Sequence, residues 1–313
     1  MKHLNTSIPA LVAAFAVLAS AASAIGQAAP EVKGPAETPL QIALWPAGQA
    51  PVDADGTEIE DANVSLLIYR PTRPNGTAMV VCAGGGYGMN LWKGAEGART
   101  AEWLNHHGIV AAVLQYRLPR GNRHRPLSDV QRAIRTVRSK AGQWSVDPQR
   151  IGIIGYSAGG HLASMAATKF DGGNANSADP LERISCRPDF AVLVYPVITM
   201  GADTHAGSRK NLLGPDPSEE LIKLFSSEQQ VTRITPPTFL AHATDDKLVP
   251  PSNSKMFHDA MVLHKVRTKY LELPNGGHGL SGYKGPSWEA WKSGSLEWMR
   301  EIRMLPKDGE EKK

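Results

Sequence analysis

Short apolar runs rich in Val, Ile and Leu alternate along this chain with segments whose apolar residues recur at helical spacing. Strands that are covered on both faces are apolar along their whole length, and such strands belong to parallel sheets. The pattern therefore predicts an α/β fold, with a mostly parallel central sheet and helices on both faces. The predicted strands span residues 64–69, 78–82, 110–116, 151–155, 190–195, 238–242 and 269–273.

The segment 128–140 is the clearest predicted helix. Its apolar residues share one face, and Ser128 with Gln131 forms a candidate capping box at its start. Three arginines fall on another face, where they predict a solvated charged surface. They are Arg132, Arg135 and Arg138. The other predicted helices span residues 97–107, 160–169, 254–264 and 287–304.

The start of the chain has the pattern of a secretory signal. Residues 1–24 combine a basic start, an apolar run and the small residues Ala22, Ser23 and Ala24, which fit a cleavage site. The apolar run is shorter than the roughly 20 residues that span a bilayer, which favours a cleaved signal over an uncleaved membrane anchor. We therefore expect export to the periplasm or the cell exterior, and no membrane partner once the signal is removed.

Downstream of the signal we expect one folded domain. Residues 25–39 are rich in Ala, Gly and Pro and predict a flexible leader, 40–305 carry the strand and helix pattern, and 306–313 form a charged tail. The stretch 198–237 lacks a strong strand signal and contains one amphipathic piece, 218–225. A stretch of this length inside a compact domain usually has structure or function of its own, so it predicts a small cap over the functional site.

The charge of the chain argues against a nucleic-acid partner. The net charge is +4, and the basic residues do not gather with interleaved aromatic residues. One basic cluster follows a predicted strand, and both a solvated loop and a contact for an acidic substrate group are open interpretations of it. The cluster comprises Arg117, Arg120, Arg123 and Arg125.

The two cysteines, Cys82 and Cys186, are predicted to be free thiols. Cys82 lies at the carboxyl end of one predicted strand and Cys186 just before the amino end of another. Those ends lie about one strand length apart, roughly 17 Å, whereas a disulfide needs Cα atoms within about 7 Å. Neither cysteine has the spacing of a zinc site and no other Cys and His residues cluster, so no metal is expected.

One motif predicts a nucleophile. Gly155-Tyr156-Ser157-Ala158-Gly159 matches G-x-S-x-G, follows a predicted strand directly and opens into a predicted helix. In such a tight turn the residues two before and two after the serine must be small, and the serine hydroxyl is exposed. We therefore predict Ser157 as the nucleophile, against the alternative of a glycine-rich helix start.

A serine hydroxyl needs a base, and the base needs an orienting acid. In this fold the chain order is Ser, then Asp or Glu, then His. Asp245 and Asp246 follow the strand 238–242. The pattern His242-x-x-x-Asp246-x-x-Val249 resembles the acid loop of many serine hydrolases, and this resemblance favours Asp246 as the acid, with Asp245 as a capping residue. His278 lies in a glycine-rich loop after the last strand and is the predicted base.

Acyl transfer also needs donors for the developing oxyanion. The sequence Ala83-Gly84-Gly85-Gly86 follows the strand 78–82, where an HGGG-type loop supplies backbone N–H groups. The predicted donors are the amides of Gly85, Gly86 and Ala158. A phosphate loop is the alternative, but the Gly-Lys-Ser/Thr ending is missing.

Longer segments resemble the α/β-hydrolase esterases related to hormone-sensitive lipase and feruloyl esterases, often described as acetyl-xylan-esterase-like. The resemblance covers about residues 44–298 and includes VVCAGGGYG at 80–88, LQYRLP at 114–119 and TFLAHATDDKLVPPSNS at 238–254. It implies hydrolysis of an ester substrate, with short acyl groups, often acetate, removed from sugar hydroxyls without a cofactor.

Aromatic residues near these motifs are candidate substrate contacts, because aromatic faces suit sugar rings. Tyr87, Tyr156 and Trp92 are placed near the mouth of the site by their motifs. Trp288 and Trp291 are further candidates, but their spacing of three residues in a predicted helix fits core packing equally well.

Two other functions fit parts of the pattern. A peptidase of the prolyl-oligopeptidase type has a similar acid loop, but it usually carries a propeller domain in front. A non-catalytic binding protein on a hydrolase scaffold would not need a nucleophile, base, acid and oxyanion glycines. The sequence does not decide the oligomeric state.

Overall fold

The computed structural model describes residues 38–45 and 64–306. All of them belong to one compact unit, Gly34–Lys313. The predicted signal peptide, the leader up to residue 37 and the tail beyond residue 306 lie outside the described residues. Of the helices in the described part of the chain, none is long and apolar enough to cross a membrane.

Eight strands form one sheet in the order β1-β2-β4-β3-β5-β6-β7-β8. β1 and β2 run antiparallel to their neighbours, and every pair from β4 to β8 is parallel. The predicted mostly parallel sheet is confirmed. The strands are β1 Leu40–Ala43, β2 Ser65–Tyr69, β3 Ala78–Cys82, β4 Val110–Gln115, β5 Ile151–Tyr156, β6 Phe190–Val194, β7 Thr238–Ala243 and β8 Thr268–Leu273.

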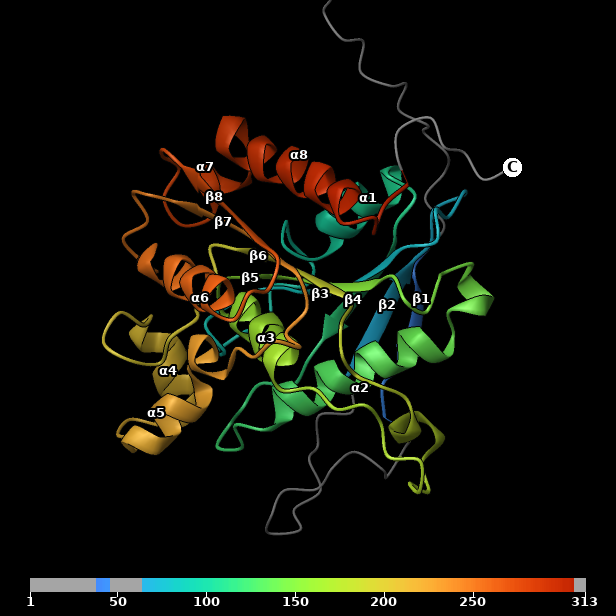
Figure 1. The fold of residues 1–313 in the computed structure, drawn as a ribbon, viewed down its shortest axis with the longest axis horizontal. Helices are drawn as coiled ribbons and strands as arrows, with labels where there is room; N and C mark the ends of the chain where they lie inside the picture. The colour runs from blue at the N-terminus through green and yellow to red at the C-terminus, as the bar shows by residue number, and fades with distance from the viewer. Residues whose placement is uncertain (1–37, 46–63, 307–313) are drawn as a thin grey trace, which may run out of the picture. The chain divides into compact units, whose positions relative to one another are not determined.

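Helices cover both faces of this sheet, as Figure 1 shows: α1 and α8 lie on one side, and α2, α3 and α6 lie on the other. Each side has its own apolar core, and side chains along β5 alternate between the two. The predicted helices on both faces are therefore confirmed. The helices are α1 Ala98–His106, α2 Arg125–Ser139, α3 Ser157–Thr168, α4 Ala206–Leu213, α5 Glu219–Phe225, α6 Ser252–Leu263, α7 Leu280–Tyr283 and α8 Gly285–Glu301.

Among the described residues, β1, α4 and the short helix α7 have no counterpart among the predictions. β1 is a short strand at the edge of the sheet with a mostly exposed burial pattern, so it lacks the apolar run that marks the other strands. α4 lies in the stretch 198–237 and begins after His205, whose ring accepts a hydrogen bond from the amide of Ser208. Histidine is not among the preferred capping residues, so the start of α4 carries no usual sequence signal.

The predicted capping box on α2 is wrong. The helix begins at Arg125 and has a proline in its first turn, so Ser128 lies inside the helix. Its hydroxyl donates to the carbonyl of His124 at 3.1 Å, and Gln131 donates instead to the carbonyl of Lys169. Proline at the first turn fixes the helix start upstream of the serine.

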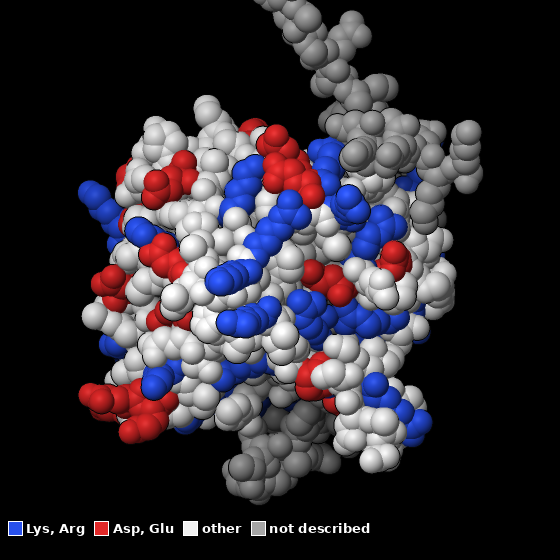
Figure 2. Space-filling model, in the orientation of Figure 1, with Lys and Arg blue, Asp and Glu red and all other residues white. Residues whose placement is uncertain are grey.

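The predicted solvated arginine face of α2 is also wrong. Arg132 and Arg135 have side chains only 4% exposed and form ion pairs of 2.6 Å with Asp179 and Asp171. These carboxylates belong to the loop between α3 and β6, which covers this face of the helix. On the side shown in Figure 2, acidic side chains lie among the basic ones.

The prediction of free cysteines is confirmed. Cys82 ends β3, Cys186 lies ahead of β6, and both are buried and unpaired.

Candidate active site

Ser157 lies where β5 ends and α3 begins, in the turn that its motif predicts. Its backbone is left-handed, with φ of 52°, a strained conformation for a residue with a side chain. The flanking glycines have no room for a side chain. A Cβ on Gly155 would lie 2.2 Å from the carbonyl oxygen of Gly159, and one on Gly159 would lie 2.2 Å from the carbonyl oxygen of Cys82. Steric contact therefore fixes the turn.

The predicted nucleophile, base and acid come together at the carboxyl ends of the parallel strands. His278 Nε2 lies 2.9 Å from Ser157 Oγ, and His278 Nδ1 lies 2.8 Å from Asp246 Oδ2. A carboxylate only accepts, so Nδ1 carries the proton and donates to Asp246. Nε2 is then free to accept the hydrogen of the Ser157 hydroxyl.

Asp246 is buried and held by several donors. Its Oδ1 accepts from the amides of Leu248 and Val249, at 2.9 and 3.0 Å. Burial alone would raise the pKa of this carboxyl, but hydrogen bonds from His242 and His278, together with the Val249 amide, outweigh it and hold the pKa well below its usual range. Asp246 is therefore ionised at neutral pH.

Asp245 points to the backbone of the base loop instead of to its imidazole. Its two oxygens accept from the amides of Gly277 at 2.8 Å and Gly276 at 3.3 Å, directly before His278. The two adjacent aspartates thus divide the work: Asp246 contacts the ring, and Asp245 holds the loop that carries it. The choice of Asp246 over Asp245 agrees with this geometry.

The glycine loop after β3 lies against the nucleophile turn. Among the described residues, the amides of Gly85 and Gly86 donate no hydrogen bond, whereas the amide of Gly84 donates to Glu96 Oε2 at 2.7 Å. The amide of Ala158 is in the first turn of α3, where helix N–H groups have no intrahelical acceptor. The three predicted oxyanion donors are therefore available.

A family model described as BD-FAE matches residues 66–261, more than half of the chain. The chain belongs to the BD-FAE family. An acetylxylan esterase from Xylanibacter ruminicola is 36% identical to it over 225 residues, which are 70% of this chain and 44% of that protein. An endo-1,4-beta-xylanase B from Butyrivibrio fibrisolvens is 35% identical over 72% of this chain and 36% of that protein. This chain spans less than half the length of either relative.

A solved structure matches the fold more completely. The acetyl ester-xyloside bifunctional hydrolase from Caldicellulosiruptor lactoaceticus superposes with a TM-score of 0.79 at 37% identity, covering 87% of this chain and 100% of that one. The BD-FAE chain thus has the α/β-hydrolase fold that its sequence resemblance implies.

Two of the three aromatic residues predicted to contact substrate are buried in the interior of this BD-FAE domain. Tyr156 is fully buried, stacks 6.2 Å from Trp288 and shares a hydrogen bond with Thr100. Tyr87 is 3% exposed, and its hydroxyl lies 2.8 Å from His161 Nδ1. The structure places both rings in the core, because each has a hydroxyl partner there.

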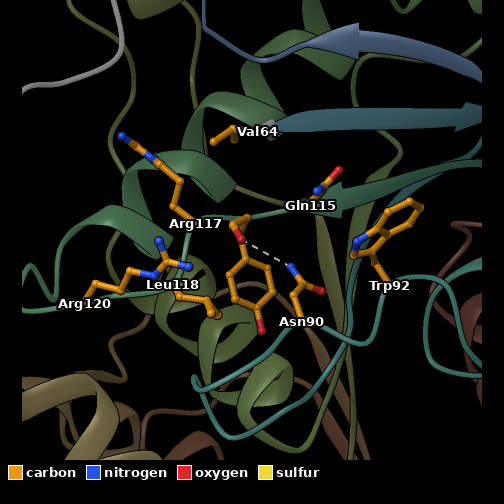
Figure 3. Close-up of a pocket in the computed structure, with 8 residues that line it drawn as sticks. Val64, Asn90, Trp92, Gln115, Arg117, Leu118 and Arg120 are labelled. Atoms are coloured by element: carbon orange, nitrogen blue, oxygen red, sulfur yellow. Dashed lines mark hydrogen bonds between the residues drawn. The ribbon is translucent and has the colours of Figure 1, made fainter. Parts of the chain in front are cut away.

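Trp92, the third, is half-buried and lines a pocket of about 160 Å³ shown in Figure 3. Asn90 enters the same pocket and donates to the carbonyl of Tyr116. The pocket also brings together two members of the predicted basic cluster, Arg117 and Arg120. Arg117 is buried and paired with Asp129 at 2.6 Å, so the solvated-loop interpretation does not hold for this arginine.

Two residues of the site have no place among the sequence predictions. His205 lies near the oxyanion loop: a Cβ on Gly86 would be 3.7 Å from its Cε1. Burial lowers the pKa of His205, and the nearby His278 lowers it further. Glu96, a buried carboxylate behind the glycine loop, is the other. No local sequence pattern marks its role, because its partners Tyr195 and Tyr283 are far away in the chain.

Proposed function

We propose that this chain is a serine carboxylic-ester hydrolase that removes short acyl groups, acetate first among them, from carbohydrate alcohols. The observation that carries the proposal is the hydrogen-bonded series from Asp246 through His278 to Ser157 in a domain of an esterase family. The names of the relatives, an acetylxylan esterase and an acetyl ester-xyloside hydrolase, support acetylated carbohydrate as the substrate class.

The first half of the reaction forms an acyl-enzyme. Ser157 Oγ attacks the ester carbonyl while His278 Nε2 takes the hydroxyl proton, and the carbonyl oxygen becomes an oxyanion. The amides of Gly85, Gly86 and Ala158 supply hydrogen bonds to that oxygen. The protonated imidazole then gives its proton to the alcohol oxygen as the ester bond breaks.

The second half returns the enzyme to its starting state. Water gives a proton to His278 and attacks the acyl carbon, and the acid leaves as Ser157 recovers its hydrogen. Asp246 stays ionised throughout and stabilises the imidazolium, because its hydrogen bonds favour the charged carboxylate.

The pocket beside Trp92 is our proposed position for the alcohol part of the substrate. Asn90 and Trp92 of the loop that begins with the oxyanion glycines line one part of it, and β4 with the segment after it lines the rest. The pocket thus joins an aromatic ring to polar side chains. Sugar rings bind to such a combination of an apolar face and hydrogen-bonding groups. The helices of the stretch 198–237 are our proposed cap, since Asn211 of α4 donates to the carbonyl of Gly86 in the oxyanion loop at 2.9 Å.

We also propose that the enzyme acts after export, because residues 1–24 have the pattern of a cleaved signal. Amino-terminal sequencing of protein recovered from the periplasm or the medium would test this. We expect a start close to Ile25, and an uncleaved chain retained in the cell would contradict export.

Turnover of a chromogenic acetate ester, an aminoacyl anilide and acetylated oligosaccharides tests the proposed reaction. We expect cleavage of the esters alone, with acetate release from the oligosaccharides. Ser157→Ala should abolish it, whereas Ser293→Ala, on the exposed side of α8, should leave it unchanged. Anilide cleavage would favour a peptidase, and no turnover of any of the three would favour a binding protein.

A further inference from the structure

Glu96 is a buried carboxylate that the reaction described above does not use. It lies between the oxyanion loop and α1, and only 3% of its surface is exposed. A carboxylate is costly to bury unless donors surround it, so its presence here needs a physical reason.

Three donors from three segments reach this side chain. The amide of Gly84 donates to Oε2 at 2.7 Å, and the hydroxyls of Tyr195 and Tyr283 donate to Oε1 at 2.9 and 3.2 Å. Gly84 precedes the predicted oxyanion donors, Tyr195 follows β6, and Tyr283 lies five residues after His278. One carboxylate therefore links the oxyanion loop to the segment that carries the base.

Two of the residues that donate to Glu96, Tyr195 and Gly84, also lie close to the reacting side chains. The ring of Tyr195 packs edge-on against the His278 imidazole, with ring centres 4.9 Å apart. A Cβ added to Gly84 would lie 3.0 Å from the Cβ of Ser157 and 2.8 Å from Glu96 Oε2. A shift of Glu96 would thus change the surroundings of both partners in the hydrogen bond between Ser157 and His278.

The hydrogen bonds favour the charged form of Glu96 but do not outweigh its burial. Burial raises the pKa of Glu96 above its usual range, and the donors Gly84, Tyr195 and Tyr283 with the attraction of His278 offset part of that rise. A backbone N–H can only donate, so the contact with Gly84 requires an acceptor oxygen. Among the described residues, the ionisable groups that interact with His278 are Asp246 in contact, Glu96 behind Tyr195, and His205.

We propose that Glu96 is a positioning residue: as a buried anion it ties the oxyanion loop to the base loop and stabilises His278 when that ring takes the proton of Ser157. The proposal rests on the proposed function, because it assigns Glu96 a part in the same proton transfer. The proposal contains two effects that different variants can separate. The positions of the oxyanion loop and the base loop depend on the hydrogen bonds to Glu96, whereas the stabilisation of protonated His278 depends on the negative charge of Glu96.

Glu96→Gln removes the anion and places an amide against donor groups. We expect kcat to fall about 10- to 100-fold, the size of losing a hydrogen bond to a charged group, with little change in KM. The acid limb of the pH profile should move to lower pH, because a lost negative charge disfavours the imidazolium. Tyr283→Phe keeps the anion and removes one donor, so kcat should fall by only a few fold with the acid limb in place.

Glu102→Gln is the matched control, because Glu102 is an exposed carboxylate on α1, and it should change neither quantity. Titration of the His278 imidazole by ¹⁵N NMR gives a readout without turnover: its midpoint should move to lower pH in Glu96→Gln and stay in Tyr283→Phe. Unmoved midpoints in both, or a Tyr283→Phe enzyme with unchanged kcat, would overturn the proposal. Absence of ester turnover in the unmodified protein would instead count against the proposed function, while the NMR titration still tests the charge coupling.

Discussion

The turn that carries Ser157 and the loop that carries His278 meet at one hydrogen bond, but they are built differently. The turn joins β5, which is fully buried, to α3, which is buried up to Ala167, and its flanking glycines touch backbone atoms of β3 and α3. Close packing of this kind leaves no alternative position for the serine. No charged side chain is needed to hold it.

The base loop packs through Leu280 and the His278 ring, but it also depends on carboxylates. Residues 279–283, directly after His278, all have left-handed backbones, with φ between 48° and 82°. Left-handed geometry costs about 1–2 kcal/mol for each residue with a side chain, so the loop needs outside support. Asp245 holds its backbone before His278, Asp246 holds the ring, and Glu96 holds Tyr283 after it. The turn that carries Ser157, which we call the packed half of the site, is thus fixed by steric contact. The loop that carries His278, which we call the charged half, is held by carboxylates.

The largest expected effect comes from the charged half. Asp246→Asn keeps the size of the side chain but presents an amide to His278 Nδ1, which favours the wrong tautomer. We expect kcat to fall by about 10⁴, as for the equivalent change in serine proteases, with the fold intact. Steady-state kinetics with an acetate ester measure this, and circular dichroism checks the fold. A loss below tenfold would mean that the contact with Asp246 does not orient the base.

A substitution in the packed half should lower the stability of the fold. Gly159→Ala would place a Cβ 2.2 Å from the carbonyl oxygen of Cys82 and 2.4 Å from that of Ala83. We expect the free energy of unfolding to fall by about 3 kcal/mol, the upper range for an overpacked core, together with turnover. Chemical denaturation measures it, and Gly142→Ala is the control, because a Cβ there meets nothing within 4 Å. Equal stability of the two variants would show that contact does not fix the turn.

The packed half was largely predictable from sequence. A G-x-S-x-G motif between an apolar run and a helix specifies a turn whose geometry follows from sterics alone, and the chain order then points to Asp246 and His278. The burial of Tyr156 was not predicted, although the alternation of side chains along β5 accounts for it. Tyr156 alternates with Ile153 and shares a face with Ile154 along β5, and that face packs on α1 and α8.

The supports of the charged half were not predictable, because they join residues far apart in the chain. Glu96 meets Tyr283 across 187 positions and Tyr195 across 99, and no local pattern marks such a pair. The arginines of α2 teach the same lesson, since their carboxylates come from a loop of the next crossover. Local rules find steric motifs, whereas buried ion pairs depend on the assembled fold.

A smaller expected effect is the pH dependence of stability that a buried histidine of the packed half contributes. His161 on α3 is buried, with Nε2 donating to the carbonyl of Phe225 and Nδ1 accepting from Tyr87, and burial lowers its pKa to about 4. The unfolded chain protonates near pH 6.5 while the folded one stays neutral, so stability falls as pH drops from 6.5 towards 4. We expect a loss of about 2 kcal/mol between pH 7 and 5, from one and a half pH units.

Chemical denaturation of the protein and of His161→Asn at the two pH values tests this assignment. The variant should lose less stability between pH 7 and 5, although it is less stable at pH 7. Asp246 has the opposite sign of effect. Its depressed pKa contributes stability above about pH 4 that is lost only below that value. Equal slopes for the two proteins would assign the acid sensitivity to other groups.

The smallest effect concerns the backbone support of the base loop. Asp245 is exposed and its bonds to the amides of Gly276 and Gly277 compete with water, so each is worth only about 1 kcal/mol. Asp245→Asn keeps one acceptor and turns an amide group towards the other N–H. We expect kcat to fall about fivefold, with the pH profile unchanged because the contact with Asp246 remains. Lys247→Gln in the same loop is the control. If Asp245→Asn instead matched the loss in Asp246→Asn, loop backbone and ring orientation would be a single unit, and the division of work between the two aspartates would not stand.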